Sequence, residues 1–388
     1  MRLIHSSDLQ IGKVFNYFSP EVAALLQDAR QAAVRTLGDL ALRTGATAVL
    51  LAGDIYDKQQ LSPQTLAKPI EGMRQFSTIA WHLMPGNHDH LRENGLWDRL
   101  LRMNLPENVH LHIKPGAVQM TDDDEMPMFL LPAPLPHIAN VDDLTAYMDK
   151  EPTPEGAVRI GMAHGSIQGF GSGGEASNLI DTARAEKAGL AYLALGDWHR
   201  QMKINDRTWY SGTPEPDAFK RPGTEGGTLC NGGAALLVEI NGARGVPSVS
   251  PLEVGRYRWH EVTKTLTDDS QIDLVEAELR ALEADLSRVV LDIDVVATLS
   301  LAGRKKFEER IVQGVGAAVC AMRWDDEGIV LEPTEADMDA IDHAGFVRVA
   351  ADRLKVLASD HSDEKQARLA SLALRRLYLE HLRQAGTQ

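Results

Sequence analysis

Short polar clusters hold the residues whose types could do chemistry in this 388-residue chain. Their side chains supply carboxylate, amide and imidazole donors and no thiolate, a set that suits Mn²⁺, Mg²⁺ or iron better than a structural zinc ion. Two cations about 3.5 to 4 Å apart can activate water and neutralise charge on a phosphate, provided that one carboxylate bridges them. The donors therefore predict a two-metal hydrolytic centre. The clusters are Asp8–Gln10, Gly53–Asp57, Gly86–Asp89, His164–Gly165 and Gly196–His199.

Apolar runs precede four of these clusters and predict the strands that position them. Their hydrophobicity is continuous rather than alternating, which is typical of strands buried on both faces. In α/β sheets, ligands gather beyond the carboxyl ends of such strands. The segment after Ser19 and Pro20 repeats apolar residues at helical spacing, which predicts a helix packed on the sheet. The pattern indicates a layered α/β domain with strands at Ala46–Leu51, Ile79–Met84, Ile160–Ala163 and Leu190–Leu195.

Taken singly, each cluster also has an interpretation that involves no function. Asp54 after a glycine is typical of a strand-end turn, Asp8 of a cap, and His164 of a hydrogen-bonded core histidine. The tetrapeptide Gly86–Asp89 is a more specific signal. The ordered set, with its members at strand ends, favours one shared site.

The ordered clusters resemble the calcineurin-like metallophosphoesterases, whose pattern is DxH, GDxxD, GNHD or GNHE, an isolated His, and GHxH. Within that family the sequence most resembles the SbcD-type DNA double-strand-break repair nucleases. Leu195–His199 is similar to their LGHxH, and Tyr210–Glu215 is similar to their YPGSPE. The resemblance covers residues 1 to about 240 and implies a layered α/β metallophosphoesterase fold. The elements that follow agree with the family in order and size but not in motif.

The resemblance implies a role for each matching residue. Asp54 would bridge the two metals. His88, followed by Asp89, matches the catalytic position that orients the phosphate and assists the leaving oxygen without ligating metal, and Asp57 would orient a ligand. The implied ligands are Asp8, Gln10, Asp54 and His199 for metal one, and Asp54, Asn87, His164 and Asp197 for metal two.

Two ligand positions depart from the family pattern, since Gln10 and Asp197 stand where the family has His. Both side chains keep a metal-binding lone pair. The amide oxygen of Gln10 is a weak ligand and should loosen metal one, whereas the carboxylate of Asp197 favours Mn²⁺ or Mg²⁺. We therefore expect two divalent ions, Mn²⁺ first with Mg²⁺ or iron as alternatives, and reduced or metal-selective activity.

The remaining chain predicts further domains. Asn241–Gly255 is rich in glycine and proline and is interpreted as a linker. Alternating strand and helix patterns follow it, and the last part of the chain has two helical segments broken near Ser359–Ser362. We expect a metallophosphoesterase catalytic domain at 1–250, a smaller α/β capping domain at 256–335, and C-terminal helices at 336–388 that could dock an ATPase.

Composition limits the class of protein. The 40 Lys/Arg and 55 Asp/Glu residues give a net charge of −15, so non-specific DNA affinity should be weak unless basic surface is local or supplied by a partner. No apolar run approaches the roughly 18 residues of a membrane span, and no signal peptide is recognisable. Cys230 and Cys320 are in no metal-ligand spacing. We expect a cytoplasmic, non-membrane protein.

The function expected from the resemblance is DNA repair by a Mn²⁺-dependent exonuclease that could also act as an endonuclease. It would act as a homodimer joined through its catalytic domain, with an SMC-like ATPase of the SbcC type as partner. The superfamily motifs alone do not fix the substrate. A phosphodiesterase for cyclic nucleotides or other small phosphoesters is therefore one alternative, and a catalytically weakened scaffold that binds DNA or the ATPase is another.

Overall fold

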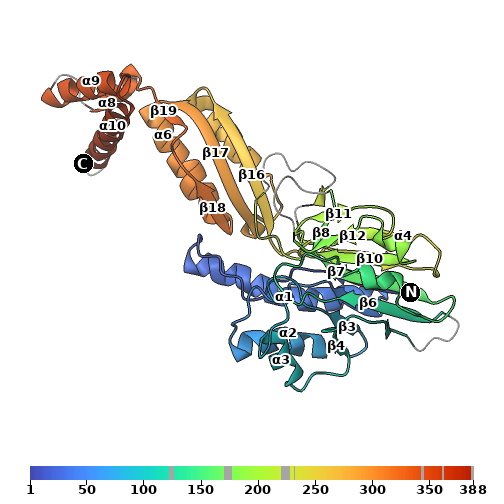
Figure 1. Ribbon diagram of the computed structural model, residues 1–388. Coiled ribbons are helices and arrows are strands. Elements are labelled where there is room, and N and C mark those ends of the chain that lie inside the picture. The colour runs from blue at the N-terminus through green and yellow to red at the C-terminus, as the bar shows by residue number, and fades with distance from the viewer. Residues whose placement is uncertain are drawn as a thin grey trace. The chain divides into compact units, whose positions relative to one another are not determined.

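The computed structural model describes residues 1–121, 126–169, 177–219, 228–230, 232–341, 345–360 and 362–385. The chain divides into two compact units, Met1–Arg258 and Trp259–Gln388, which are described separately. No helix in the described residues is both long and apolar enough to cross a membrane. Figure 1 labels many of the elements of both units.

The first unit contains two sheets. The first has the strand order β15-β14-β1-β2-β3-β4, with β1 to β4 parallel. The second has the order β13-β11-β12-β10-β7-β6-β5, with β6, β7, β10 and β12 parallel. Their strands are β1 (Arg2–Ser6), β2 (Ala48–Leu51), β3 (Ala80–Leu83), β4 (Val109–Leu111), β5 (Val118–Gln119), β6 (Met128–Ala133), β7 (Val158–His164), β10 (Tyr192–Gly196), β11 (Gln201–Lys203), β12 (Thr208–Tyr210), β13 (Thr228–Cys230), β14 (Ala234–Glu239) and β15 (Ser248–Glu253).

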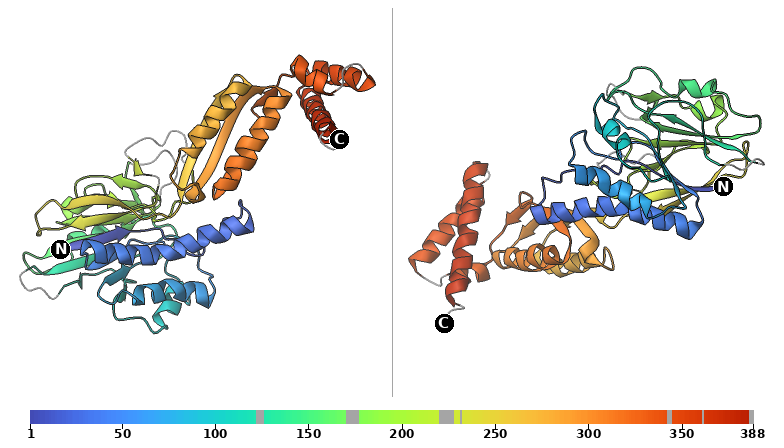
Figure 2. Two further views of the ribbon diagram at one scale, coloured as in Figure 1. Left: turned by 180° about the vertical axis from the view of Figure 1, so that it is seen from behind. Right: turned by 90° about the horizontal axis from the view of Figure 1, so that it is seen from below.

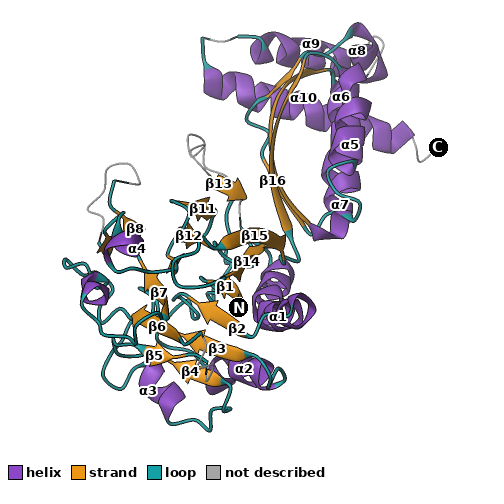
Figure 3. Ribbon diagram, turned by 90° about the vertical axis from the view of Figure 1, so that its right-hand side faces the viewer, coloured by secondary structure: helices purple, strands orange, loops and turns teal. Residues whose placement is uncertain are grey.

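Buried apolar side chains join these elements into layers. One core lies between the two sheets and includes Leu50 from β2 and Ile160 from β7. A second core joins the outer face of the first sheet to α1 (Pro20–Thr44), α2 (Pro63–Arg74) and α3 (Leu96–Leu101). In Figure 3, α1 and α2 lie next to each other beside this sheet. The second sheet is covered by η1 (Ala146–Asp149) and α4 (Arg184–Lys187). The two small strands β8 (Ser166–Ile167) and β9 (Leu179–Ile180) form a separate pair. The predicted layered α/β domain is confirmed.

Helix α1 shows how local sequence sets these elements. The Ser19 side chain accepts a hydrogen bond from the backbone N–H of Val22, Pro20 occupies the first turn, and Gly45 ends the helix with φ 67°. Its buried residues follow the helical spacing seen in the sequence, and they include Leu26, Ala33, Val34 and Leu37.

The second unit has one sheet built from β16 (Arg258–Leu266), β17 (Val289–Leu299), β18 (Ala321–Trp324) and β19 (Ile329–Leu331). Its core packs against α5 (Ile272–Arg280), α6 (Leu301–Phe307) and the π-helical segment η4 (Glu308–Val315). These helices lie on one face of the sheet (Figure 2). A short α7 (Gly316–Ala318) follows them. A smaller core unites α8 (Glu335–Ile341), α9 (Phe346–Ala358) and α10 (Glu364–Ala385).

The interpretation of Asn241–Gly255 as a linker is wrong for much of its length, because this segment contains β15. This strand pairs with β14 along six residues at the edge of the first sheet. Pro251 is tolerated there because a strand edge leaves a backbone N–H without a ladder partner. The glycine and proline content therefore indicated an edge strand with its turns, and the first unit continues to Arg258.

Candidate metal centre

The predicted ligand residues come from the carboxyl ends of strands in both sheets. Asp8 follows β1, Asp54 follows β2 and Asn87 follows β3, while His164 ends β7 and Asp197 follows β10. Because the carboxyl ends of parallel strands meet at one edge, these side chains converge although they lie far apart in the sequence.

Unusual backbone geometry brings these loops close together. Asp8, Asp54 and Asp197 have φ values of 55°, 52° and 101°, which are uncommon for non-glycine residues and cost on the order of 1 to 3 kcal/mol each. A Cβ atom at Gly86 would lie 2.2 Å from Asp54 Oδ1, and one at Gly53 would lie 2.3 Å from His164 Nδ1. The glycines of the two motifs are therefore needed for the close approach of backbone to ligand side chains.

His164 is the centre of one half of the site. Its Nδ1 lies 2.8 Å from the carbonyl oxygen of Ala52 and donates to it, so the neutral ring presents a lone pair at Nε2. That nitrogen lies 3.1 Å from Asn87 Oδ1, 3.6 Å from Asp54 Oδ1 and 3.9 Å from Asp197 Oδ1. Electron-rich atoms thus face one another and require a cation or a proton between them. This half fits a divalent metal.

Burial and the close carboxylates shift the pKa values of His164, Asp8 and Asp54. Burial alone would lower the pKa of His164, but Asp54, Asp8 and Asp197 raise it well above its ordinary value. Burial raises the pKa of Asp8. For Asp54, burial opposes ionisation, yet His164 lowers its pKa overall. Within the described residues, Asp8, Asp54 and His164 are the group of potential ligands whose atoms all lie within 4.8 Å of one another.

Gln10 and His199 form the other half of the site and contact each other. Gln10 Nε2 lies 3.0 Å from His199 Nε2, and His199 Nε2 lies 3.8 Å from Asp8 Oδ1. His199 Nδ1 lies 2.9 Å from Asp217 Oδ2. Lys13 Nζ donates to Gln10 Oε1 at 2.9 Å and to Asp217 Oδ2 at 2.7 Å. The atoms of this half that could ligate a metal are therefore hydrogen-bonded to other protein groups.

Asp217 anchors this half and was not predicted from the sequence. Its Oδ2 atom also accepts from the buried Arg30 guanidinium at 3.1 Å. Burial opposes ionisation of Asp217, but Arg30, His199 and Lys13 hold its pKa well below the ordinary value. Arg30 also donates to the Leu9 carbonyl oxygen at 2.8 Å, which ties α1 to the first loop. The family motifs do not include Lys13, Arg30 or Asp217. In the sequence, only the place of Lys13 three residues after Gln10 weakly indicated that it would lie near the site.

The predicted catalytic pair divides into two different environments. The exposed His88 ring donates from Nδ1 to the Asp57 carbonyl oxygen at 3.0 Å, and its Nε2 lies 3.9 Å from Asp54 Oδ2. Asp89 is fully buried. Its carboxylate accepts the backbone N–H of Gly86 at 2.7 Å and of Tyr56 at 3.1 Å, and burial raises its pKa to about 8. Asp89 therefore holds two site loops together, and Asp57 contacts His88 through its backbone.

The comparisons with known proteins agree with this geometry. The family model of the calcineurin-like phosphoesterases matches residues 1–201. The uncharacterized metallophosphoesterase YhaO of Bacillus subtilis (strain 168) is 27% identical over 241 residues, which cover 58% of this chain. This chain spans only 56% of that relative's length.

Solved structures with similarity to this chain have low identity. TT1561 of Thermus thermophilus is 12% identical with a TM-score of 0.40, and the match covers 65% of this chain and 98% of that one. GAP50, the anchor in the inner membrane complex of Plasmodium, is 11% identical with a TM-score of 0.39, covering 66% and 89% of the two chains. Purple acid phosphatase PPD1 of yellow lupin is 13% identical with a TM-score of 0.38, covering 66% and 51%.

Proposed function

Because this chain belongs to the calcineurin-like phosphoesterase family, we propose that it is a divalent-metal-dependent hydrolase that cuts phosphodiester bonds in DNA, as an SbcD-type repair nuclease would. The observation that carries the hydrolytic part is the convergence of Asp54, Asn87 and His164 from the carboxyl ends of two sheets. The DNA part rests on the nuclease-like motifs at Leu195–His199 and Tyr210–Glu215.

In this proposal, each residue near His164 has a distinct task. Asp54, Asn87, His164 and Asp197 would hold the metal, with Asp8 beside them. A bound divalent ion supplies Lewis-acid stabilisation of the phosphate and makes a bound water more acidic. The hydrogen bond from His164 to the Ala52 carbonyl oxygen fixes the ring so that Nε2 points to the oxygen ligands.

His88 would manage the proton of the leaving oxygen. Its Nδ1–H is held by the Asp57 carbonyl oxygen, so the ring has one orientation with Nε2 toward Asp54. The ring is exposed, and substrate can therefore reach it. A proton at Nε2 would be given to the departing sugar oxygen, a general-acid role that commonly contributes about 10²- to 10⁴-fold to rate. Asp89 acts here as a positioning residue for the loop that carries His88.

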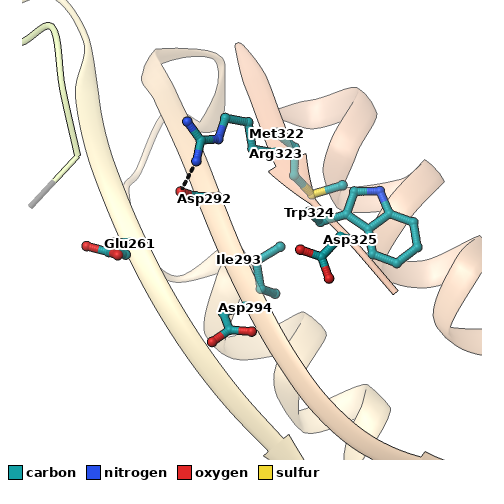
Figure 4. A pocket seen from close by; sticks show the side chains of 8 residues that line it. All are labelled: Glu261, Asp292, Ile293, Asp294, Met322, Arg323, Trp324 and Asp325. Atoms are coloured by element: carbon teal, nitrogen blue, oxygen red, sulfur yellow. Dashed lines mark hydrogen bonds and ion pairs between the residues drawn. The ribbon is translucent and has the colours of Figure 1, made fainter. Parts of the chain in front are cut away.

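The acidic surface of the second unit limits where this unit could bind DNA. The open face of the second unit's sheet holds a pocket with four acidic side chains, and the guanidinium of Arg323 pairs with Asp292 at 2.8 Å (Figure 4). Such a surface repels phosphates. A DNA-guiding role for residues 256–335, the proposed capping domain, would then use another face. The acidic residues of this pocket are Glu261, Asp292, Asp294 and Asp325.

The terminal helices support the proposal of an ATPase partner. Phe346, Val349 and Val356 recur along α9 and are 85%, 56% and 71% exposed, so this helix offers apolar side chains to a partner. We propose that α9 and α10 dock the base of a coiled coil in an SbcC-type ATPase. The proposal also includes a homodimer joined through the catalytic domain and a cytoplasmic location.

The acidic charge favours a second candidate function, hydrolysis of cyclic nucleotides or other small phosphoesters. A net charge of −15 and an acidic sheet face impede a polyanion much more than a small substrate.

The two functions are separated by supplying Mn²⁺ and comparing linear DNA, a chromogenic diester and cyclic nucleotides, with Asp54→Ala as the inactive control. We expect slow DNA cleavage that falls steeply with salt, since each phosphate contact contributes roughly one unit of log-log slope. Efficient cyclic-nucleotide hydrolysis without DNA cleavage, with or without the ATPase, would replace the nuclease proposal. Wild-type activity no higher than that of Asp54→Ala on all three substrates would favour the catalytically weakened scaffold.

A further inference from the structure

The half of the centre formed by Gln10 and His199 has little capacity left to bind a metal. His199 donates from Nδ1 to Asp217, so the lone pair at its Nε2 accepts the Gln10 amide N–H at 3.0 Å. The Gln10 oxygen accepts from Lys13 at 2.9 Å. The hydrogen bond from Gln10 uses the single lone pair of His199 Nε2, and the hydrogen bond from Lys13 uses one of the two lone pairs of the Gln10 oxygen.

Lys13 fixes the orientation of the Gln10 amide. An ammonium group only donates hydrogen bonds, so the amide atom beside it must be the oxygen. Turning that oxygen toward a metal would place the amide N–H₂ against the ammonium, two donors facing each other. The Lys13 ammonium is held in place by Asp217 at 2.7 Å, and Asp217 is held by the buried Arg30.

The two halves also differ in charge. Three carboxylates, those of Asp8, Asp54 and Asp197, surround His164 without a fixed cationic side chain among the contacts described for them. On the His199 side, Lys13 and Arg30 share the carboxylate of Asp217, and Asp8 faces both halves because its Oδ1 also lies 3.8 Å from His199 Nε2. Two side-chain cations therefore lie beside the ligands that the family pattern implies for a second metal, and they weaken the attraction of a divalent cation to this half.

We propose that this centre is mononuclear: one divalent ion binds at Asp54, Asn87, His164 and Asp197, with Asp8 beside it, while the Lys13 ammonium replaces the second cation. This inference rests on the proposed metal-dependent hydrolase and deepens it. The Lys13 side chain is 23% exposed, so its charge is accessible to a substrate phosphate. A point charge at this position would stabilise a phosphate oxygen as a metal would, though more weakly.

Metal stoichiometry tests this inference without reference to activity. The full chain is loaded with Mn²⁺, freed of unbound metal and analysed by plasma mass spectrometry and electron paramagnetic resonance. We expect one Mn²⁺ per chain with the spectrum of isolated ions. Two Mn²⁺ per chain with exchange-coupled spectra would overturn the mononuclear assignment.

A double variant tests whether Gln10 and Lys13 cause the change. Gln10→His with Lys13→Met restores an imidazole and removes the ammonium while keeping its apolar stem, so a second Mn²⁺ should bind and the spectrum should become coupled. Lys68→Ala is the matched control, because Lys68 is 60% exposed and contacts only Asp28, at 4.0 Å, among its described ion pairs. The Lys68→Ala chain should still bind one Mn²⁺.

If the double variant folds, as judged by circular dichroism, and still binds one ion, these residues do not block the second site. A wild-type chain that binds one Mn²⁺ but cleaves no DNA would refute the nuclease and leave this inference standing. A chain that cleaves DNA and binds two ions would support the nuclease proposal and refute the mononuclear assignment.

Discussion

The two halves of the centre contain similar residue types but leave their donor atoms in different states. Around His164, an imidazole lone pair faces amide and carboxylate oxygens at 3.1 to 3.9 Å. Of these oxygens, Asp54 Oδ1 also accepts the His88 backbone N–H at 2.9 Å, which uses only one of its lone pairs. Around His199, a chain of hydrogen bonds runs from Asp217 through the ring to Gln10 and on to Lys13. Ligand identity is therefore insufficient to define a metal site, because a second layer of residues decides which lone pairs remain available.

The largest effect should come from Asp54→Ala, which removes the carboxylate nearest to His164 on the metal-binding side. We expect loss of bound Mn²⁺ and a fall in diester hydrolysis of at least about 10³-fold, because a catalytic metal contributes several kcal/mol of charge stabilisation. Metal analysis and a chromogenic diester assay measure the two effects. Retention of Mn²⁺ by this variant would place the metal elsewhere.

His88→Ala should be the next largest change and should separate chemistry from metal binding. The variant should keep its Mn²⁺ while turnover falls by about 10²- to 10⁴-fold, the range for a lost general acid. The Mn²⁺ content of the purified variant checks the first statement and steady-state rates check the second. Equal metal loss in His88→Ala and Asp54→Ala would show that His88 is a ligand.

Matched histidine variants test the difference between the halves directly. His164→Ala should weaken Mn²⁺ binding by at least roughly 10- to 100-fold. Loss of a residue that only orients a ligand already has an effect of this size. His199→Ala should leave the Mn²⁺ dissociation constant unchanged, because its Nε2 is bonded to Gln10. Calorimetric titration with Mn²⁺ measures both, and equal weakening in the two variants would remove the distinction.

Phe346→Asp should have the smallest effect on chemistry and provides a reference outside the centre. Phe346 is 85% exposed, so the variant should fold, bind Mn²⁺ and hydrolyse a chromogenic diester as the wild type does. Binding to an SbcC-type ATPase should be lost if α9 is the docking surface, because a charge would enter an apolar contact. Pull-down with the ATPase measures this, and unchanged binding would exclude this residue from the interface.

Much of the fold could be predicted from local sequence patterns. The apolar runs before the clusters became β2, β3, β7 and β10, and Ser19 with Pro20 began α1 where the capping pattern indicated. These elements were predictable because capping and continuous hydrophobicity depend on neighbouring residues. The sequence did not indicate the edge strand β15, because its residues are mostly exposed and include Pro251, so that only pairing with β14 makes them a strand.

The sequence by itself determined the donor types, their order and their placement at strand ends, because each of these is a property of a short segment. It also marked Gln10 and Asp197 as departures from the family pattern. Only the tertiary structure decided what those donors face. Lys13, Arg30 and Asp217 meet at the His199 half from separate segments of the chain, and no local pattern reports such a meeting. The availability of a lone pair depends on atoms brought within about 3 Å by folding.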